Sequence, residues 1–295
     1  MKTMHRILLL SDTHGNLDLI NRFAAEYHAD LCIHCGDVGF FTAQSVLQLP
    51  HAELTRMVRH AALSAERKEF LLALEPQKLT QEVISERLAG NFEDYLAGAK
   101  RFDIPVYAVW GNHEDVKIIE QLQHTPVENF TLLHETNPVV IDKVRFYGLG
   151  GDFNEKHLTM SEKGGIPVVK HQIKSSFFQY AKLCRTLDGL PQEETRIQIT
   201  HVSPIENPFI ELVANHCRAS LTLSGHMHRN EHQFFNGRTA GELDVYYSEL
   251  KKRFPRLPWK ILQPQGTSKS AKHINLAAQK PLVIEIDNGN WQIIS

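Results

Sequence analysis

Five short apolar runs, spread between residues 6 and 224, constrain the fold of this chain more than any other feature. They are rich in β-branched residues, they end at glycine or turn residues, and segments with helical spacing separate them. Buried strands of an α/β fold have this pattern, because helices cover both faces of a largely parallel sheet. We therefore predict strands at Arg6–Leu10, Asp30–Cys35, Ile104–Trp110, Arg196–Thr200 and Ser220–Ser224.

Residues that commonly bind metals follow each of these runs. The C-terminal ends of strands in open α/β sheets border one crevice, so side chains that follow separate strands meet there. Because side chains alternate along a strand, the members of each pair Asp12/His14 and His226/His228 are expected to point to the same side. Two Asp, one Asn and five His are predicted to converge, namely Asp12, His14, Asp37, Asn112, His113, His201, His226 and His228.

The side-chain types in this set indicate a centre of two divalent transition-metal ions. Imidazole and carboxylate ligands without a thiolate favour Mn, Fe, Zn or Co over Ca, Mg or an iron–sulfur cluster. Asp37 is the natural bridge, because one carboxylate has two oxygens. Two such ions polarise phosphoryl oxygens and generate a bridging hydroxide near neutral pH, which predicts a phosphate ester as the substrate. His113 lies beside Asn112 on a glycine-bounded turn and is placed to protonate the leaving alkoxide.

In their order along the chain, these motifs resemble those of the calcineurin-like metallophosphoesterase superfamily: D-x-H, G-D, G-N-H-[D/E], H and G-H-x-H. The resemblance implies an α/β fold in which a two-sheet β-sandwich is flanked by helices. It also implies that His113 is catalytic without being a metal ligand. One metal would take Asp12, His14, Asp37 and His228, and the other would take Asp37, Asn112, His201 and His226.

The chain departs from one branch of this superfamily just after Gly36-Asp37. Protein Ser/Thr phosphatases carry an Asp-Arg pair there, in which the Asp pairs with the catalytic His and the Arg holds phosphate. Phe40 and Phe41 occupy those positions in this chain, which disfavours a protein phosphatase. The two rings are candidates for an apolar substrate rim, and packing beneath the following helical segment is the alternative.

We treat residues 1–295 as a single domain with two insertions, because the chain shows no internal repeat and no low-complexity linker. Residues 41–103 carry two apolar stripes at helical spacing, and Thr80 is a candidate cap for the second helix. This pattern predicts an antiparallel helical hairpin that serves as a specificity cap, a dimer surface or extra core cover. Residues 235–273 form the second insertion, which is basic.

The charge of the chain limits the classes of partner that it is expected to bind. The net charge is −2, so no global field recruits nucleic acid or an acidic membrane. A local exception is Lys251–Lys272, where basic residues are interleaved with Phe254 and Trp259. Such a segment is usually a solvated face, but it also suits phosphate binding and base stacking.

The favoured function is hydrolysis of a small phosphodiester or phosphomonoester, with nucleotide-derived compounds among the candidates. A metal-dependent nuclease is the alternative. A scaffold that has kept the fold and lost catalysis is disfavoured, because the ligand set and His113 are complete.

Two further residues are candidates to contact substrate alongside Phe40 and Phe41. Asp152 follows a strand predicted at Val144–Leu149, and Arg229 follows the last ligand. The remaining histidines, His60 among them, show no ligand spacing.

Four cysteines are too few for a disulfide scaffold at this length, and no stretch suits a signal segment or a membrane span. These features predict a cytoplasmic protein, and they do not indicate its oligomeric state.

Overall fold

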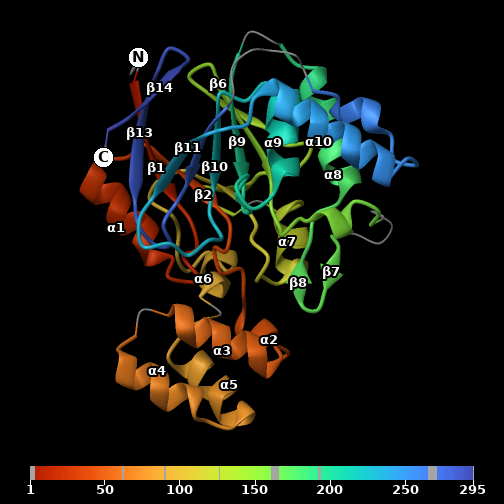
Figure 1. Ribbon diagram of the computed structural model, residues 1–295. Helices are drawn as coiled ribbons and strands as arrows, with labels where there is room; N and C mark the ends of the chain where they lie inside the picture. Colours follow the sequence, from red (N-terminus) through yellow and green to blue (C-terminus); the bar gives the residue numbers. More distant parts are fainter. Residues whose placement is uncertain are drawn as a thin grey trace.

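Two mixed sheets of six strands each lie at the centre of the molecule (Figure 1). The computed structural model describes residues 4–61, 63–89, 91–125, 127–160, 166–191, 194–264 and 271–294. The first sheet has the order β14 (Asn290–Ile293), β13 (Leu282–Asp287), β1 (Met4–Leu10), β2 (Leu31–Cys35), β3 (Val106–Val109) and β4 (Phe130–Leu132). The second has the order β11 (Gln233–Asn236), β12 (Lys272–Asn275), β10 (Leu221–Ser224), β9 (Thr195–Thr200), β6 (Val144–Leu149) and β5 (Val139–Ile141).

The inner strands of each sheet run parallel. In the first sheet, β1, β2, β3 and β4 pair in parallel, with Leu9 opposite Ile33. In the second sheet, β12, β10, β9 and β6 do the same, with Leu223 opposite Ile199. The five predicted strands are confirmed, with shifts of a few residues at their ends. Parallel pairing brings the C-terminal ends of neighbouring strands to one edge of each sheet.

The alternation of side chains along β1 shows why residues 7–10, its buried part, are all apolar. Ile7 and Leu9 pack in a cluster that joins the two sheets and includes Ile199 of β9. Leu8 and Leu10 belong to a second cluster that includes Ile20. All of these side chains are fully buried. Complete burial of each such side chain stabilises the fold by about 1.5–3 kcal/mol, so an apolar residue is favoured at each of these four positions.

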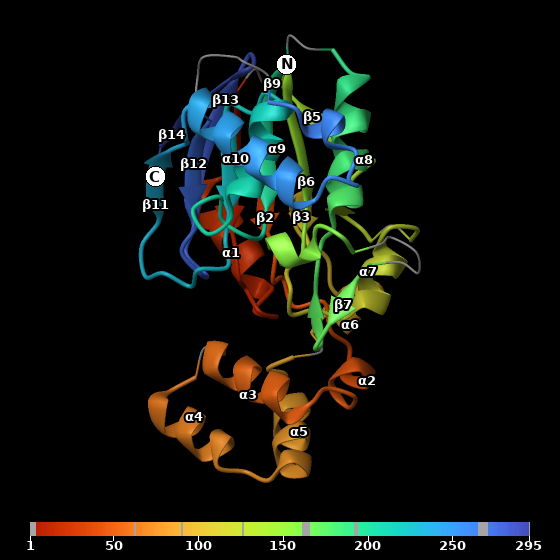
Figure 2. The same cartoon turned by 45° about the vertical axis from the view of Figure 1, so that its right-hand side comes forward.

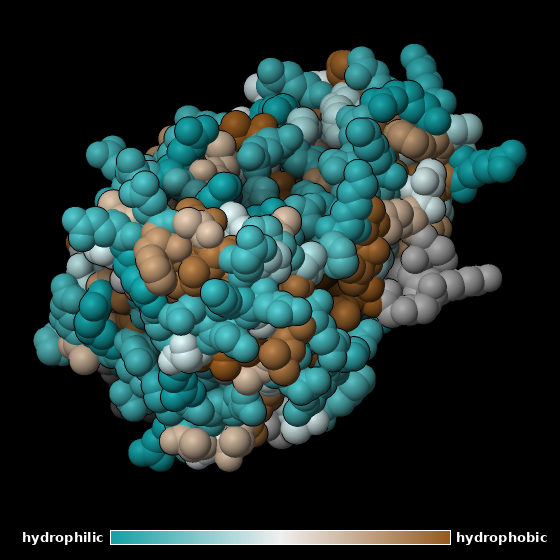
Figure 3. Space-filling model, turned by 90° about the horizontal axis from the view of Figure 1, so that it is seen from below, coloured by the Kyte–Doolittle hydropathy of each residue, from teal (hydrophilic) through white to brown (hydrophobic). Residues whose placement is uncertain are grey.

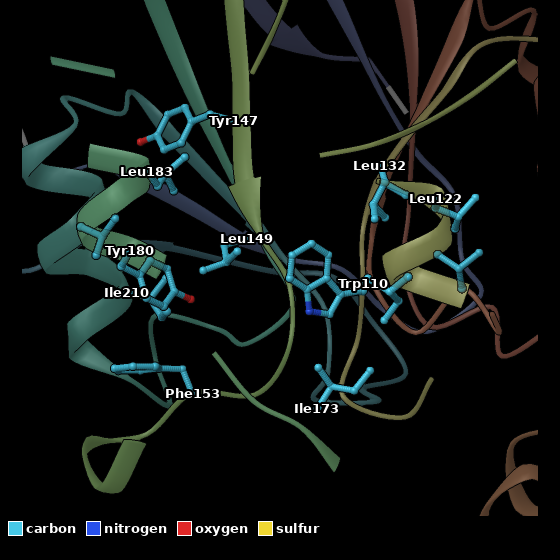
Figure 4. Close-up of a cluster of buried hydrophobic side chains, with 14 of the residues drawn as sticks. Trp110, Leu122, Leu132, Tyr147, Leu149, Phe153, Ile173, Tyr180, Leu183 and Ile210 are labelled. Atoms are coloured by element: carbon cyan, nitrogen blue, oxygen red, sulfur yellow. The ribbon is translucent and has the colours of Figure 1, made fainter. Parts of the chain in front are cut away.

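Helices cover the outer faces of the two sheets (Figures 1 and 2). On the first sheet, α1 (Asp18–Tyr27) contacts β1 and β2, and α7 (Val116–Leu122) contacts β4. On the second sheet, α8 (Phe177–Asp188) contacts β6. The helix α9 (Pro208–His216) and the 3-10 helix η2 (Trp259–Leu262) pack against α8, and α10 (Ala240–Arg253) packs against α9. Figure 4 shows Trp110 at the centre of the buried cluster, between Leu149 on one side and Leu132 on the other. Among the described residues, no helix combines the length and apolar character needed to cross a bilayer.

Four short helices form a lobe that lies below the sheets in Figures 1 and 2. They are α2 (Ala43–Val46), α3 (His51–His60), α4 (Ala65–Leu72) and α5 (Pro76–Ser85), called here the helical lobe. The lobe has its own hydrophobic cluster, which includes Leu54, Val58, Leu79 and Val83. Seen from below, the surface is largely hydrophilic with separate apolar patches (Figure 3). The next helix, α6 (Phe92–Leu96), returns to the body, because Phe92 packs in the main cluster.

The predicted two-helix hairpin is wrong in its details. The first stripe breaks at His60, and a new helix begins after Ser64, whose side chain accepts a hydrogen bond from the Arg67 N–H. Pro76 starts α5 rather than only stopping the preceding helix, since proline suits the first helical position. Thr80 lies inside α5 and does not cap it. Apolar spacing alone did not reveal these breaks.

A second difference concerns the segment Lys170–Leu187, in which the spacing of Phe177, Ala181 and Cys184 predicts a helix. Its first part instead forms β8 (Gln172–Ile173), which pairs with β7 (Val168–Val169). The helix α8 begins only at Phe177, after a capping box between Ser176 and Gln179. The cap residue sets the start of the helix, because it satisfies N–H groups that have no partner within the helix.

Candidate active site

The predicted ligands lie on turns just beyond the strands. Asp12, His14 and Asp37 have φ values of 56°, 48° and 51°, and His226 and His228 have 70° and 44°. Such left-handed conformations are uncommon for residues other than glycine, and they cluster at functional sites. The expectation that strand alternation aligns these side chains is therefore wrong. Left-handed turns after β1, β2 and β10 orient them instead.

A first group brings together Asp12, His14, Asp37 and His228. One candidate ligand atom from each lies within 4.8 Å of the others. His228 Nε2 is 3.4 Å from Asp12 Oδ1, and His14 Nδ1 is 4.0 Å from Asp37 Oδ2. The two carboxylates are completely buried. Buried carboxylates are costly unless a cation or hydrogen bonds compensate them.

The donor atoms of this group fit a metal ion. Asp12 Oδ1, Asp37 Oδ2 and His14 Nε2 are buried and have no hydrogen-bond partner among the described residues. Buried polar atoms are normally satisfied, so three unsatisfied ligand atoms in one place call for a compensating group. A divalent cation bound by carboxylate and imidazole supplies that compensation.

A second group lies on the other side of Asp37. His201 Nε2 is 3.6 Å from Asp37 Oδ2 and 3.0 Å from Asn112 Oδ1. His226 Nδ1 is 3.2 Å from the same His201 nitrogen. His201 Nδ1 donates a hydrogen bond to the Cys35 carbonyl at 2.9 Å. This bond fixes the ring and leaves Nε2 facing the group, as the outer hydrogen bond of a metal-binding histidine does.

The ionisation of these groups suits cation binding. Burial alone would raise the pKa of Asp37, but His201, His14 and His113 hold that pKa well below its usual range. Burial lowers the pKa of His14. Burial and the neighbouring His201 lower the pKa of His226 to about 4. Asp37 is therefore ionised and the imidazoles of His14 and His226 are neutral, which are the forms that bind metals. The pKa of His201 is raised, because Asp37 and Asp12 outweigh the effect of burial.

Two features of the motifs hold the strand ends together. A side chain at Gly111 would overlap the Asp37 carboxylate, so only glycine allows this approach. Glu114 is buried, and it accepts hydrogen bonds from the N–H groups of Gly39 at 3.0 Å and Gly111 at 2.6 Å. Burial and the nearby Asp37 raise the pKa of Glu114 to about 8. Glu114 thus ties the loop after β2 to the loop after β3.

His113 faces both the body and the helical lobe. Its backbone N–H donates to Asp37 Oδ1 at 3.1 Å, and its ring Nε2 accepts from Asn112 Nδ2 at 2.9 Å. On the lobe side, Nδ1 is 3.1 Å from Glu53 Oε2. Arg56 Nη1 is 2.8 Å from His113 Nε2. Glu53 and Arg56 both come from α3, and sequence reasoning did not identify them.

His60, at the end of α3, also reaches the first group. Its ring stacks on His14 with centroids 4.6 Å apart and on His228 with centroids 4.2 Å apart. Candidate ligand nitrogens of all three lie within 4.8 Å of one another. The interpretation that set His60 aside is therefore wrong. The helical spacing of Glu53, Arg56 and His60 indicates that the three residues share one face of α3. It does not show which part of the molecule that face contacts.

The candidate substrate contacts have different surroundings. Phe40 is fully buried and packs edge-on against Phe92 and Phe130, so a rim role for Phe40 is wrong. Phe41 is mostly buried and lines a narrow hollow with His14, His113, Glu53 and Arg56.

Asp152 and Arg229 do not line this narrow hollow. Asp152 pairs with Lys174 and lines a hollow of about 770 Å³ beside His226. Arg229 is exposed at the surface.

Comparison with solved structures supports the fold. One crystal structure matches with a TM-score of 0.53 at 11% identity, over 99% of this chain and 98% of its own. The protein TT1561 of Thermus thermophilus matches with a TM-score of 0.47 at 12% identity, over 99% of both chains. A predicted phosphoesterase of Streptococcus pneumoniae matches with a TM-score of 0.35 at 10% identity, over 99% of this chain and 89% of its own. At such identities the first match supports the architecture alone.

Comparison with protein families is more specific. No match is found among the curated proteins. The family model for calcineurin-like phosphoesterases matches residues 5–230. That span begins in β1 and ends just after His228, so it contains all the turns that carry the candidate ligands. The chain belongs to the calcineurin-like phosphoesterase family and is a metal-dependent hydrolase of phosphoric esters.

Proposed function

We propose that this protein hydrolyses a small phosphodiester or phosphomonoester, nucleotide-derived compounds included, at a centre of two divalent transition-metal ions. The observation that carries the proposal is the place of the buried Asp37 carboxylate between two ligand groups. A carboxylate so placed suits the bridge between two cations. Mn, Fe, Zn and Co are the candidates for this set of oxygen and nitrogen ligands.

In this proposal the first ion is held by Asp12, His14, Asp37 and His228, and the second by Asp37, Asn112, His201 and His226. When bound, such ions polarise the phosphoryl oxygens and lower the pKa of an attacking water. The residues of the chain orient the ester and handle the proton. His113 is assigned the donation of a proton to the leaving oxygen, because it lies beside both Asp37 and Asn112.

The test is hydrolysis by protein loaded separately with Mn, Fe, Co, Ni or Zn. Bis-p-nitrophenyl phosphate tests diester cleavage, and p-nitrophenyl phosphate and phenyl phosphate test monoester cleavage. Turnover is expected with at least one metal. Absence of turnover with every metal, at full occupancy, would refute the proposal and favour an inert scaffold.

His113→Ala tests the assigned proton donor. We expect the kcat for phenyl phosphate to fall by roughly a hundred-fold or more, because its leaving group depends on protonation. Metal content, measured by elemental mass spectrometry, should stay unchanged. An unchanged kcat would remove His113 from the mechanism.

A nuclease remains the second candidate because of the basic residues near Lys251–Lys272. The surroundings of its aromatic residues weaken it. Trp259 is 3% exposed and packs against Phe177 and Tyr247, so its ring is not free to stack on a base. Arg253 pairs with Glu155 at 2.5 Å. These contacts favour a small substrate over a nucleic acid. The cytoplasmic location of the protein stays a prediction.

A further inference from the structure

We infer that one face of α3 completes the active site, with Glu53 positioning His113 and Arg56 binding the phosphoryl group of the substrate. The inference deepens the proposed function and rests on it. It assigns the helical lobe a direct part in the reaction.

The two faces of α3 have opposite surroundings. Residues 53, 56, 57 and 60 follow helical spacing and share one face. On the other face, Leu54 and Val58 pack in the lobe's own cluster. Glu53, Arg56 and Met57 line the narrow hollow together with His113. The polar face of this helix is therefore turned to the ligand turns of the body instead of to open solvent.

Glu53 has the geometry of a residue that orients His113. Its Oε2 lies 3.1 Å from His113 Nδ1, and both side chains are only about one-tenth exposed, at 11% and 12%. A carboxylate at Nδ1 holds that nitrogen as the donor and fixes the ring, so Nε2 faces the reacting groups. Although burial opposes it, the contacts with His113 and Arg56 lower the pKa of Glu53, which keeps the carboxylate ionised.

Arg56 is placed to bind an anion beside His113. Its Nη1 donates to Glu53 Oε2 at 2.7 Å and contacts both ring nitrogens of His113, lying 2.8 Å from Nε2. A guanidinium carries five N–H donors in a planar fork, and these contacts use one nitrogen of the three. The side chain is 32% exposed, so it lies at the mouth of the site rather than in the core. Its charge and donors suit the phosphoryl oxygens of an ester.

These contacts also explain how the site operates with Phe40 and Phe41 in the loop after Asp37. Neither ring carries charge, and both pack in hydrophobic clusters. The carboxylate and the guanidinium next to His113 come instead from a helix that begins ten residues later, at His51.

The experiment compares variants of α3 with two matched variants of exposed residues in the lobe. Glu53→Gln, Glu53→Ala and Glu53→Asp probe the positioning residue, and Glu69→Gln is the control. Arg56→Ala and Arg56→Lys probe the phosphate contact, and Arg59→Ala is the control on the same helix. Metal content and circular dichroism are measured for every variant, so loss of folding is recognised.

For Glu53, the readout is the dependence on the leaving group. In Glu53→Ala and Glu53→Gln, kcat should fall roughly ten- to hundred-fold for phenyl phosphate. It should fall much less for p-nitrophenyl phosphate, because its leaving group, p-nitrophenolate, departs without a proton. Glu53→Asp should recover part of the loss. Equal losses on both substrates, or losses no larger than in Glu69→Gln, would overturn the positioning role.

For Arg56, the readout is binding of inorganic phosphate to the metal-loaded protein, measured by calorimetry. The Kd should rise roughly ten- to hundred-fold in Arg56→Ala, as expected for a lost hydrogen bond to a charged group. Arg56→Lys should show a smaller rise. A Kd unchanged from that of Arg59→Ala would overturn the assignment. This measurement needs no turnover, so failure of the inference is distinguishable from failure of the proposed function.

Discussion

The body holds its metal-binding candidates on turns that follow buried strands, whereas the helical lobe presents Glu53, Arg56 and His60 on one helix. In the body, each turn is anchored by a strand whose side chains are buried on both faces. In the lobe, helices of four to ten residues share a small cluster of their own. Isolated helices this short are marginal in water, so the lobe depends on that cluster.

This difference teaches which part of the site is rigid. Ligand geometry must be held closely for metal binding, and strands covered on both faces are among the most stable elements of a fold. A lobe with a small core opens at a lower free energy than the body does, so the contacts that it makes are lost more easily. We therefore expect metal binding to depend mainly on the integrity of the body, with a smaller contribution from His60, and phosphate binding to depend on that of the lobe.

The largest expected effect is that of Asp37→Asn, which removes the carboxylate shared by both ligand groups. Losing several kcal/mol of charge stabilisation corresponds to roughly a thousand-fold or greater fall in kcat/KM. Metal content should fall with it. The exposed Asp244→Asn is the matched control. Full metal occupancy in Asp37→Asn would contradict the body's assigned role.

A pair of core substitutions separates the two regions. Leu9→Ala in the body and Leu79→Ala in the lobe each remove a fully buried side chain, at an expected cost of about 2–5 kcal/mol. Leu9→Ala should lower the Tm of the whole protein. Leu79→Ala should raise hydrogen exchange mainly in α3, α4 and α5 while metal content is retained. If both variants lose metal equally, the comparison fails.

A smaller effect is expected for His60→Ala. This change removes the imidazole that stacks on His14 and His228. Loss of a residue next to metal ligands typically weakens metal affinity about ten-fold or more. The control is His51→Ala, which changes an exposed histidine at the start of the same helix. Metal retention during dialysis against a chelator is the measurement, and equal retention in both variants would show that His60 does not support the site.

The smallest effect is expected in the basic segment of the body. Binding of a single-stranded oligonucleotide is measured at several salt concentrations, and the slope of log affinity against log salt should be close to zero. A steep negative slope would mean that several phosphates are neutralised by lysine and arginine, which favours the nuclease.

The body was largely predictable because its signals are local. An apolar run bounded by glycine predicts a strand, and a ligand residue just after it predicts a side chain at the sheet edge. This reasoning located the turns that carry Asp12, Asp37 and His226, which stay candidate ligands. The turn conformation was missed: these residues adopt left-handed backbone angles that residue type alone does not reveal.

The lobe shows where sequence reasoning stopped. Its helical character was read from apolar spacing, but its breaks at His60 and Pro76 depend on caps and short links. Glu53 and Arg56 look like ordinary charged residues on the solvent face of a helix. Only the packing of α3 against the ligand turns gives them another neighbour, His113.

By itself, the sequence determined the ordered strand ends and the ligand types that they carry, because strand formation and metal preference follow from residue chemistry over a few positions. The tertiary structure alone decided which helix face covers those ligands, because that depends on contacts between Glu53 and His113, 60 positions apart.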